Sequence, residues 1–319
     1  MRDVRVVLAV NKELAGENAN LHVANELGYA EENGIRFVLE SALGSTDGTK
    51  LVSTGQAEVA YPSPFVALTA RASGVPIVSV FDNLQTNIFG FAVKPNSPIA
   101  SIADLKGKKV ALGDGGWTVI AAPLLASAGL TIDDVEWVVA GERRQLAVEQ
   151  GDVDAVLTWE MEYQNWADQG LEFRVFGQDS VPYQSNTLVM SEELVKSDPD
   201  LVKAIARASA MGAEFIQHNP EAGAQIATQT YEGTTPQSLE GMTAVVTKLA
   251  ELMAGGEGGT DRYGAHRADD WQGLADSLFA DGVIGAEVDV STMLSDDFID
   301  YANDFDRDRV RQDAEGYKP

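Results

Sequence analysis

Aromatic and acidic side chains follow several of the predicted strands of this 319-residue sequence. Trp117 and Trp159 could hold a planar ring between them, because large aromatic side chains offer flat apolar faces to a ligand. Glu160 or Asp82 could then accept a hydrogen bond from an amine or a ring N–H. This combination of residue types favours a neutral or cationic nitrogen heterocycle as the ligand.

Ligands of open α/β sheets bind beside the carboxyl ends of the strands. We predict no catalytic residue, metal ligand or cofactor there, since the sequence has no cysteine and its three histidines lie far apart. The candidate ligand-binding residues share a position after a predicted strand, and they are Asn11, Glu13, Ser45, Thr46, Tyr61, Ser63, Phe81, Asp82, Asp114, Gly116, Trp117, Thr118, Trp159, Glu160, Tyr183 and Asn186.

A small anion, such as an alkanesulfonate, nitrate or a carboxylate, is the alternative ligand. The glycine-rich turn at residues 113–116 precedes a predicted helix, and its free backbone N–H groups would suit an anion. The basic residues near the predicted site are Lys12 and the pair Arg143 and Arg144, and we interpret this pair as a solvated helix start. Because several carboxylates beside an anion would weaken its binding, we favour the heterocycle.

Two further function classes stay open. An enzyme on the same scaffold would need an acid/base pair, and Glu160 with Asp82 or Asp114 could form one, but no histidine or nucleophile accompanies it. A regulator's effector domain would carry a helical DNA-binding module, which is not visible. The formal net charge of −26 also speaks against contact with nucleic acid. We interpret the scattered acidic residues as a solvated coat.

Alternating strands and helices should position the candidate residues. Two such βα units predict parallel sheets with covering helices. Residues 55–61 and 151–159 follow the same pattern of glycine, acid and a short strand ending in an aromatic residue, which indicates two lobes built on one plan. The first unit has predicted strands at 4–10, 35–40 and 77–81 and a helix at 21–33. The second has strands at 108–112, 135–139 and 173–176. Crossover strands are expected at 89–93 and 183–190, and helices from 191 on, with a flexible break at 255–259.

Several motifs resemble one family. They are Leu51 with residues 55–60, residues 74–77, the stretch Ser-Ile-Ala-Asp-Leu-Lys-Gly-Lys-Lys-Val at 101–110, residues 129–135 and residues 151–155. Together they are similar to the NMT1/THI5-like (SsuA/ThiY-like) branch of type II periplasmic binding proteins. The resemblance implies two α/β lobes, each a mostly parallel sheet flanked by helices, with two crossover strands as a hinge. It places lobe 1 at 1–90, lobe 2 at 91–187, and the return to lobe 1 plus a helical extension at 188–319.

The resemblance also implies a function. Such proteins are solute receptors of bacterial ABC importers, which close around a small molecule and meet a membrane permease. We therefore expect a monomer at the periplasmic or extracellular face of the cytoplasmic membrane, with its signal peptide removed, and a ligand such as a pyrimidine precursor of thiamine. Family members that make such a precursor use a cysteine-rich motif, and the absence of cysteine here favours a receptor over an enzyme.

Overall fold

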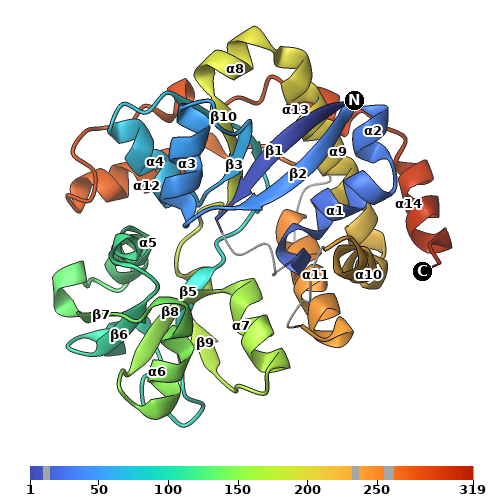
Figure 1. Ribbon diagram of the computed structural model, residues 1–319. Coiled ribbons are helices and arrows are strands. Elements are labelled where there is room, and N and C mark those ends of the chain that lie inside the picture. The colour runs from blue at the N-terminus through green and yellow to red at the C-terminus, as the bar shows by residue number, and fades with distance from the viewer. Residues whose placement is uncertain (10–14, 232–236, 255–261, 319) are drawn as a thin grey trace.

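Two five-stranded sheets, each covered by helices, form two lobes in the computed structural model (Figure 1). The structure describes residues 1–9, 15–231, 237–254 and 262–318. The first sheet has the order β2-β1-β3-β10-β4, and the second has the order β7-β6-β8-β5-β9. The strands are β1 (Arg2–Leu8), β2 (Ile35–Ser41), β3 (Val59–Tyr61), β4 (Ile77–Asp82), β5 (Phe89–Val93), β6 (Lys109–Leu112), β7 (Glu136–Val139), β8 (Ala155–Trp159), β9 (Arg174–Phe176) and β10 (Thr187–Ser191).

Each sheet contains one strand that runs against the others. Strand β10 pairs antiparallel with β3 and β4, whereas β1 pairs parallel with β2 and β3. In the second sheet β5 pairs antiparallel with β8 and β9, whereas β6 pairs parallel with β7 and β8. The two reversed strands are those that follow the passages between the lobes. The predicted mostly parallel sheets are thus confirmed, with one returning strand in each.

The central strands are apolar runs because both faces of each sheet are covered. All residues of β5 and β8 are buried, as expected for strands with helices on both sides. The predicted helix at 21–33 is instead two helices, because Gly28 adopts a left-handed φ of +77° between them. The helices are α1 (Ala19–Glu26), α2 (Tyr29–Glu32), α3 (Ser45–Ser53), α4 (Pro64–Ala72), α5 (Thr118–Ala126), α6 (Arg144–Gln150), α7 (Glu160–Asp168), α8 (Glu192–Ser197), α9 (Pro199–His218), α10 (Pro220–Thr230), α11 (Leu239–Met253), α12 (Ala268–Ala280), α13 (Ile299–Asn303) and α14 (Arg307–Gly316).

The sequence echo between residues 55–61 and 151–159 corresponds to equivalent places in the two sheets. Strand β3 lies between β1 and β10, and β8 lies between β6 and β5. Each follows a helix whose end is marked by a glycine with positive φ, Gly55 at +70° and Gly151 at +82°. Each strand also ends in an aromatic residue, Tyr61 or Trp159. The two lobes therefore repeat one plan.

The last third of the chain packs mainly on the first lobe. Helix α9 contacts α1, α10, α11, α13 and α14, and α12 contacts α4. The buried carboxylate of Glu214 on α9 accepts hydrogen bonds from Arg307 (2.6 Å) and Arg311 (2.7 Å), which fixes α14. Helix α11 also contacts α7 of the second lobe, so this third of the chain bridges both lobes.

None of the helices in the described part of the chain combines the length and the apolar character that a membrane crossing requires. The expected flexible break at 255–259 lies outside the described residues.

Candidate functional site

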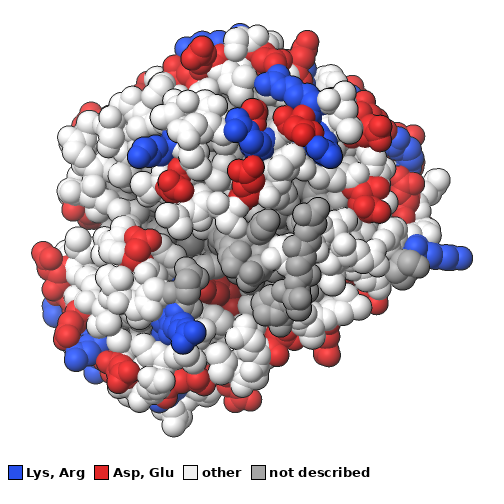
Figure 2. All heavy atoms as spheres, viewed as in Figure 1, with Lys and Arg blue, Asp and Glu red and all other residues white. Residues whose placement is uncertain are grey.

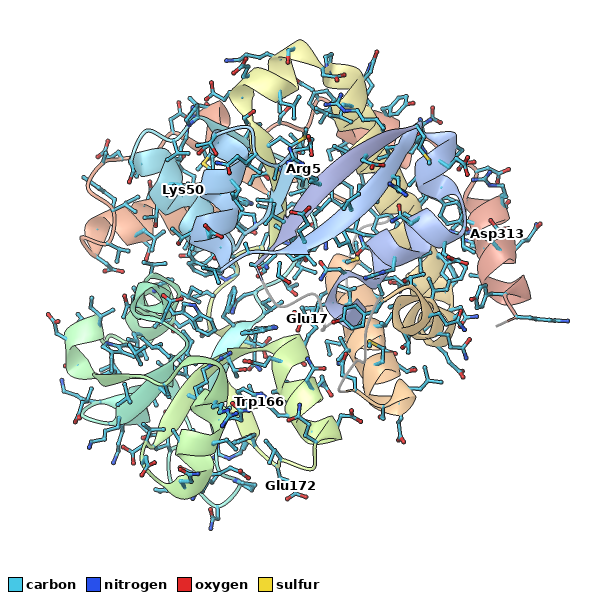
Figure 3. The ribbon with its side chains drawn as sticks, in the orientation of Figure 1. Arg5, Glu17, Lys50, Trp166, Glu172 and Asp313 are labelled. Carbon is cyan, nitrogen blue, oxygen red and sulfur yellow. The ribbon has the colours of Figure 1, made fainter. Side chains whose placement is uncertain are left out.

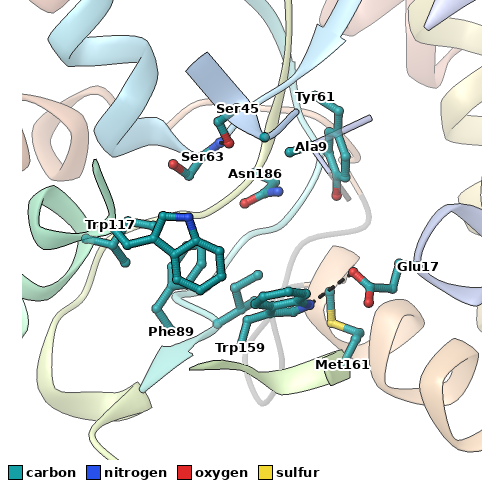
Figure 4. Close-up of a pocket in the computed structure, with 13 residues that line it drawn as sticks. Ala9, Glu17, Ser45, Tyr61, Ser63, Phe89, Trp117, Trp159, Met161 and Asn186 are labelled. Atoms are coloured by element: carbon teal, nitrogen blue, oxygen red, sulfur yellow. Dashed lines mark hydrogen bonds between the residues drawn. The ribbon is translucent and has the colours of Figure 1, made fainter. Parts of the chain in front are cut away.

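A pocket lies between the two lobes, with about 590 Å³ of empty space that includes some open to solvent (Figure 4). One side carries polar groups from the first lobe and the other carries aromatic groups from the second (Figure 4). The described residues that line it are Ala9, Glu17, Gly44, Ser45, Tyr61, Ser63, Ile88, Phe89, Trp117, Ile120, Trp159, Met161 and Asn186.

The polar side is built from helix starts and strand ends. Ser45 begins α3, and Ser63 precedes α4, whose first residue is Pro64. The backbone N–H of Ser63 donates to Ser45 Oγ at 3.2 Å. Ser63 Oγ is buried and has no hydrogen-bond partner among the described residues, even though Ser63 occupies the N-cap position. A polar ligand group could supply the missing partner.

The aromatic side is built around Trp117 and Trp159. Trp159 ends β8 and Trp117 precedes α5, so both come from the second lobe. Their ring centroids are 5.8 Å apart with an angle of 63° between the planes, which is an edge-to-face contact. In this conformation no planar ligand fits between them. The expected sandwich is therefore not present, and the two rings form one continuous wall.

Arg144 explains why the rings meet in this way. Its side chain is fully buried, and the guanidinium lies 4.4 Å from the Trp117 ring centroid and 5.2 Å from that of Trp159. It also forms an ion pair with Glu162, to which Thr158 Oγ1 donates at 2.8 Å. The interpretation of the arginine pair as a solvated helix start is thus wrong for Arg144 and holds only for Arg143, which is exposed.

Glu17 is the acidic group of the pocket, and Figure 3 shows it between the lobes. It is 4% exposed, in a short 3₁₀ turn (Ala15–Asn18) before α1. Its Oε2 accepts a hydrogen bond from Trp159 Nε1 at 3.1 Å, whereas Oε1 has no partner among the described residues. Burial raises the pKa of Glu17 to about 8, and the nearby Glu162 carboxylate adds to this increase. Near neutral pH the Glu17 carboxyl is therefore largely protonated.

Among the sixteen expected site residues, the structure brings one group together in this pocket and leaves the others elsewhere. Asn11 and Glu13 lie outside the described residues, as does Lys12. Thr46 follows Ser45 in α3 but is exposed and does not line the pocket. The expected residues that line the pocket are Ser45, Tyr61, Ser63, Trp117, Trp159 and Asn186. The described ones that do not are Thr46, Phe81, Asp82, Asp114, Gly116, Thr118, Glu160 and Tyr183.

Asp82 and Phe81 are buried in the first lobe instead of facing the pocket. Strand β4 is an edge strand, and the C-terminal third of the chain covers its end, where the Asp82 N–H donates to the Gly264 carbonyl at 2.8 Å. Asp82 Oδ2 accepts a hydrogen bond from Trp271 Nε1 of α12 at 2.8 Å. Burial raises the pKa of Asp82 well above its usual range. The expected role of Asp82 as a ligand acceptor is thus replaced by a bond to α12.

The glycine turn uses much of its hydrogen-bonding capacity internally. Asp114 accepts from the Gly116 N–H at 2.7 Å, and Thr118 Oγ1 donates to the Gly115 carbonyl at 3.1 Å. Glu160 lines a different cavity, where its carboxylate lies 3.8 Å from Lys248 Nζ. Tyr183 lines neither of these two cavities.

The structure adds seven lining residues that the sequence analysis missed. Ile88 and Phe89 lie where the chain passes between the lobes, and a rule that such passages border an inter-lobe cleft would have found them. Ala9 follows the end of β1, and Gly44 precedes the first residue of α3, Ser45, which the sequence analysis had selected. Glu17, Ile120 and Met161 follow no strand end directly, and nothing in their local sequence singles them out.

Comparison with known proteins identifies relatives of this chain. The family model described as "NMT1/THI5 like" matches residues 16–223. The riboflavin-binding protein RibY of Chloroflexus aurantiacus is 25% identical, over 88% of this chain and 82% of its own length. A formylaminopyrimidine-binding protein of Halalkalibacterium halodurans is 25% identical, over 79% and 78%. Some relatives are named as enzymes, such as a 4-amino-5-hydroxymethyl-2-methylpyrimidine phosphate synthase of Legionella pneumophila, which is 24% identical over 68% and 71%.

The solved structures agree on the fold. The alkanesulfonate-binding protein SsuA from Xanthomonas axonopodis pv. citri, bound to MOPS, superimposes with a TM-score of 0.71 at 16% identity. The match covers 92% of this chain and 98% of that one. The predicted two-lobed fold is confirmed.

Proposed function

The chain belongs to the NMT1/THI5 like family, and from that premise we propose that it is a solute receptor that binds a small nitrogen heterocycle in the pocket between its lobes. A pyrimidine of the thiamine-precursor type is the favoured ligand. Binding would proceed by closure of the two lobes around the solute, a hinge motion at the two passages between the sheets.

The observation that carries this proposal is the composition of the pocket. One wall is aromatic, and the acidic group beside it, Glu17, has a buried oxygen that finds no partner among the described residues. No lysine, arginine or histidine is among the described residues that line it. An uncharged or cationic ring with N–H donors matches these groups better than an anion does. The names of two relatives, which specify riboflavin and formylaminopyrimidine, support a ring of this class.

We also infer a partner and a location. A receptor of this kind would deliver its solute to the membrane permease of an ABC importer, as a monomer at the periplasmic or extracellular face of the cytoplasmic membrane. The structural similarity to proteins named as periplasmic binding proteins for aliphatic sulphonates and for nitrate supports this inference.

A small anion is the second candidate ligand. Ser45 and Ser63 lie at the N-terminal ends of α3 and α4, where backbone N–H groups attract negative charge. The structural neighbour from Xanthomonas is named as an alkanesulfonate-binding protein. Because none of the described lining residues is a lysine, arginine or histidine that could balance a negative charge, the anion is the weaker candidate.

An enzymatic role has less support, although some relatives are named as synthases. Ser79, His266 and Asp296 are linked in the order of a hydrolase triad, with 2.6 Å from His266 Nε2 to Ser79 Oγ and 2.6 Å from Nδ1 to Asp296 Oδ1. However, Ser79 is fully buried, also bonds Thr187 and does not line the pocket. We therefore assign this chain of bonds to fastening the C-terminal third onto β4.

The first test is a thermal-shift screen followed by calorimetry. The probes are 4-amino-2-methylpyrimidine, riboflavin, MOPS and nitrate, because a solute that binds only the folded state raises the melting temperature. We expect a pyrimidine to bind and Trp159→Ala to weaken its binding by about tenfold or more, since the aromatic wall is lost. An exposed aromatic change, Tyr301→Ala, serves as the control. Binding of MOPS or nitrate alone would favour the anion, and binding unaffected by Trp159→Ala would argue against this pocket.

A further inference from the structure

We propose that Glu17 determines which solutes the pocket accepts, by pairing its carboxyl with a ligand edge that carries a ring nitrogen next to an amino group. This inference rests on the proposed function and specifies the ligand class of the same pocket. Such an edge offers one hydrogen-bond acceptor and one donor side by side, and a protonated carboxyl offers the complementary pair.

The first argument is the missing partner of Oε1. A buried polar atom without a hydrogen bond is destabilising, so most such atoms are paired. Glu17 is 4% exposed and lines the pocket, and its Oε1 has no partner among the described residues. A ligand atom in the pocket would satisfy it.

The second argument is the fixed orientation of the carboxyl. Trp159 Nε1 donates to Oε2 at 3.1 Å, which holds the carboxyl group while leaving Oε1 available (Figure 4). A carboxyl oxygen has two lone pairs, so Oε2 can accept a second hydrogen bond from a ligand amino group. The same tryptophan forms part of the aromatic wall. A ring on that wall would thus have its polar edge near Glu17.

The third argument is the position of the proton. The groups that act on Glu17 are the Glu162 carboxylate, the Arg144 guanidinium and the Trp159 indole, and Tyr61 lies near enough to be affected by it. Burial and Glu162 together outweigh the other two, and they keep a proton on Glu17 near neutral pH. With Oε1–H as donor and Oε2 as acceptor, the pair with an aminopyrimidine forms without a net charge. A sulfonate or carboxylate offers acceptors only. It could accept from Oε1–H but has no donor for the second lone pair of Oε2, so it forms one of the two bonds instead of both.

The test compares two probes that differ in one group. Calorimetry near neutral pH measures the affinity of 4-amino-2-methylpyrimidine and of 2-methylpyrimidine, which lacks the amino group. The wild-type protein should prefer the amino compound by about tenfold or more. Glu17→Leu should reduce this preference to below about threefold, because Leu can neither donate nor accept. Glu17→Gln should retain the preference, because its amide offers a donor and an acceptor in the same places. Glu26→Gln, an exposed change on α1, is the matched control.

Each outcome decides the inference. A wild-type protein that binds both pyrimidines equally would overturn it without any variant, and so would a preference that survives in Glu17→Leu or disappears in Glu17→Gln. If the protein binds methanesulfonate in a manner sensitive to Trp159→Ala but shows no amino preference, the receptor function stands and the role of Glu17 falls. If none of these probes, riboflavin or nitrate binds, both are rejected.

Discussion

At the scale of single residues, the Glu17 carboxyl is the feature with the widest consequences. Its native pKa of about 8 lies above the usual value of 4.5, so between these values the folded protein holds a proton that the unfolded chain has lost. The free energy of unfolding must therefore fall as the pH rises through this range. The decrease ends near the native pKa, above which both states are ionised.

A comparison of wild type with Glu17→Gln isolates this effect. Wild type should lose up to about 1.4 kcal/mol of stability per pH unit relative to the variant up to pH about 8. Asp82 also has a raised pKa, but it contributes equally to both proteins. His22, whose pKa burial lowers to about 4, acts at lower pH in both. Urea unfolding at a series of pH values measures the difference, and parallel pH curves would show that Glu17 is not held protonated.

Arg144 is the second residue whose loss should be costly. Arg144→Met removes the cation that pairs with the buried Glu162 carboxylate and that lies beside Trp117 and Trp159. We expect a loss of about 3–5 kcal/mol in the free energy of unfolding. The control is Arg36→Met, since Arg36 and Asp3 form an ion pair in which both side chains are more than half exposed. That change should cost less than about 1 kcal/mol. Equal losses in the two variants would contradict the argument.

At the scale of elements, the sequence predicts what local patterns determine. The glycines at 55 and 151 and the short apolar runs after them identify β3 and β8, because helix ends and strands leave local signals. Tyr61 and Trp159 end these strands, and both line the pocket; their role in binding a ligand stays a prediction.

The errors arise where distant parts of the chain meet. Asp82 was expected at the cleft, but Trp271, 189 residues away, bonds it inside the first lobe. Glu17 was missed because its importance comes from Trp159, 142 residues away, and not from any neighbour in sequence. In the sequence Arg144 resembles an exposed cation at the start of a helix. Only the fold brings Glu162, Trp117 and Trp159 into contact with its guanidinium. Tertiary contacts of this kind leave no periodicity that a single sequence displays.

The contact between α7 and α11 gives a prediction about lobe closure. Asp168 at the end of α7 accepts the backbone N–H of Ser238 at 2.8 Å and also the Ser238 hydroxyl. Asp168→Ala removes these two bonds between α7 and the start of α11, so the arrangement in which the two helices are in contact should lose stability. We expect the affinity for a bound solute to fall by about fivefold and the average lobe separation in X-ray scattering to increase.

The control for this prediction is Asp200→Ala, which removes an exposed acid that pairs with Lys203 on α9. Affinity and scattering should stay at the wild-type values in that variant. An unchanged affinity and scattering profile in Asp168→Ala would show that the α7–α11 contact does not control closure.

At the scale of the whole molecule, two lobes of one plan face each other across the pocket, and acidic side chains are scattered over the visible face of both (Figure 2). On that face the acidic side chains of this chain, whose net charge is −26, do not gather into one patch. The pocket proposed for solute recognition lies between the lobes, where Glu17 is the one acidic group among the described lining residues.

The hydrogen bond between Glu17 and Trp159 places an intrinsic fluorophore at the contact between the two lobes. Glu17 lies beside the helices of the first lobe and Trp159 ends a strand of the second, so any change in lobe separation alters the surroundings of this indole. Trp117 and Trp159, two of the five tryptophans, line the pocket. Their emission should therefore change when a solute enters, and Trp159→Phe should remove most of that signal. Rapid-mixing fluorescence could then follow capture and release in real time without any attached dye.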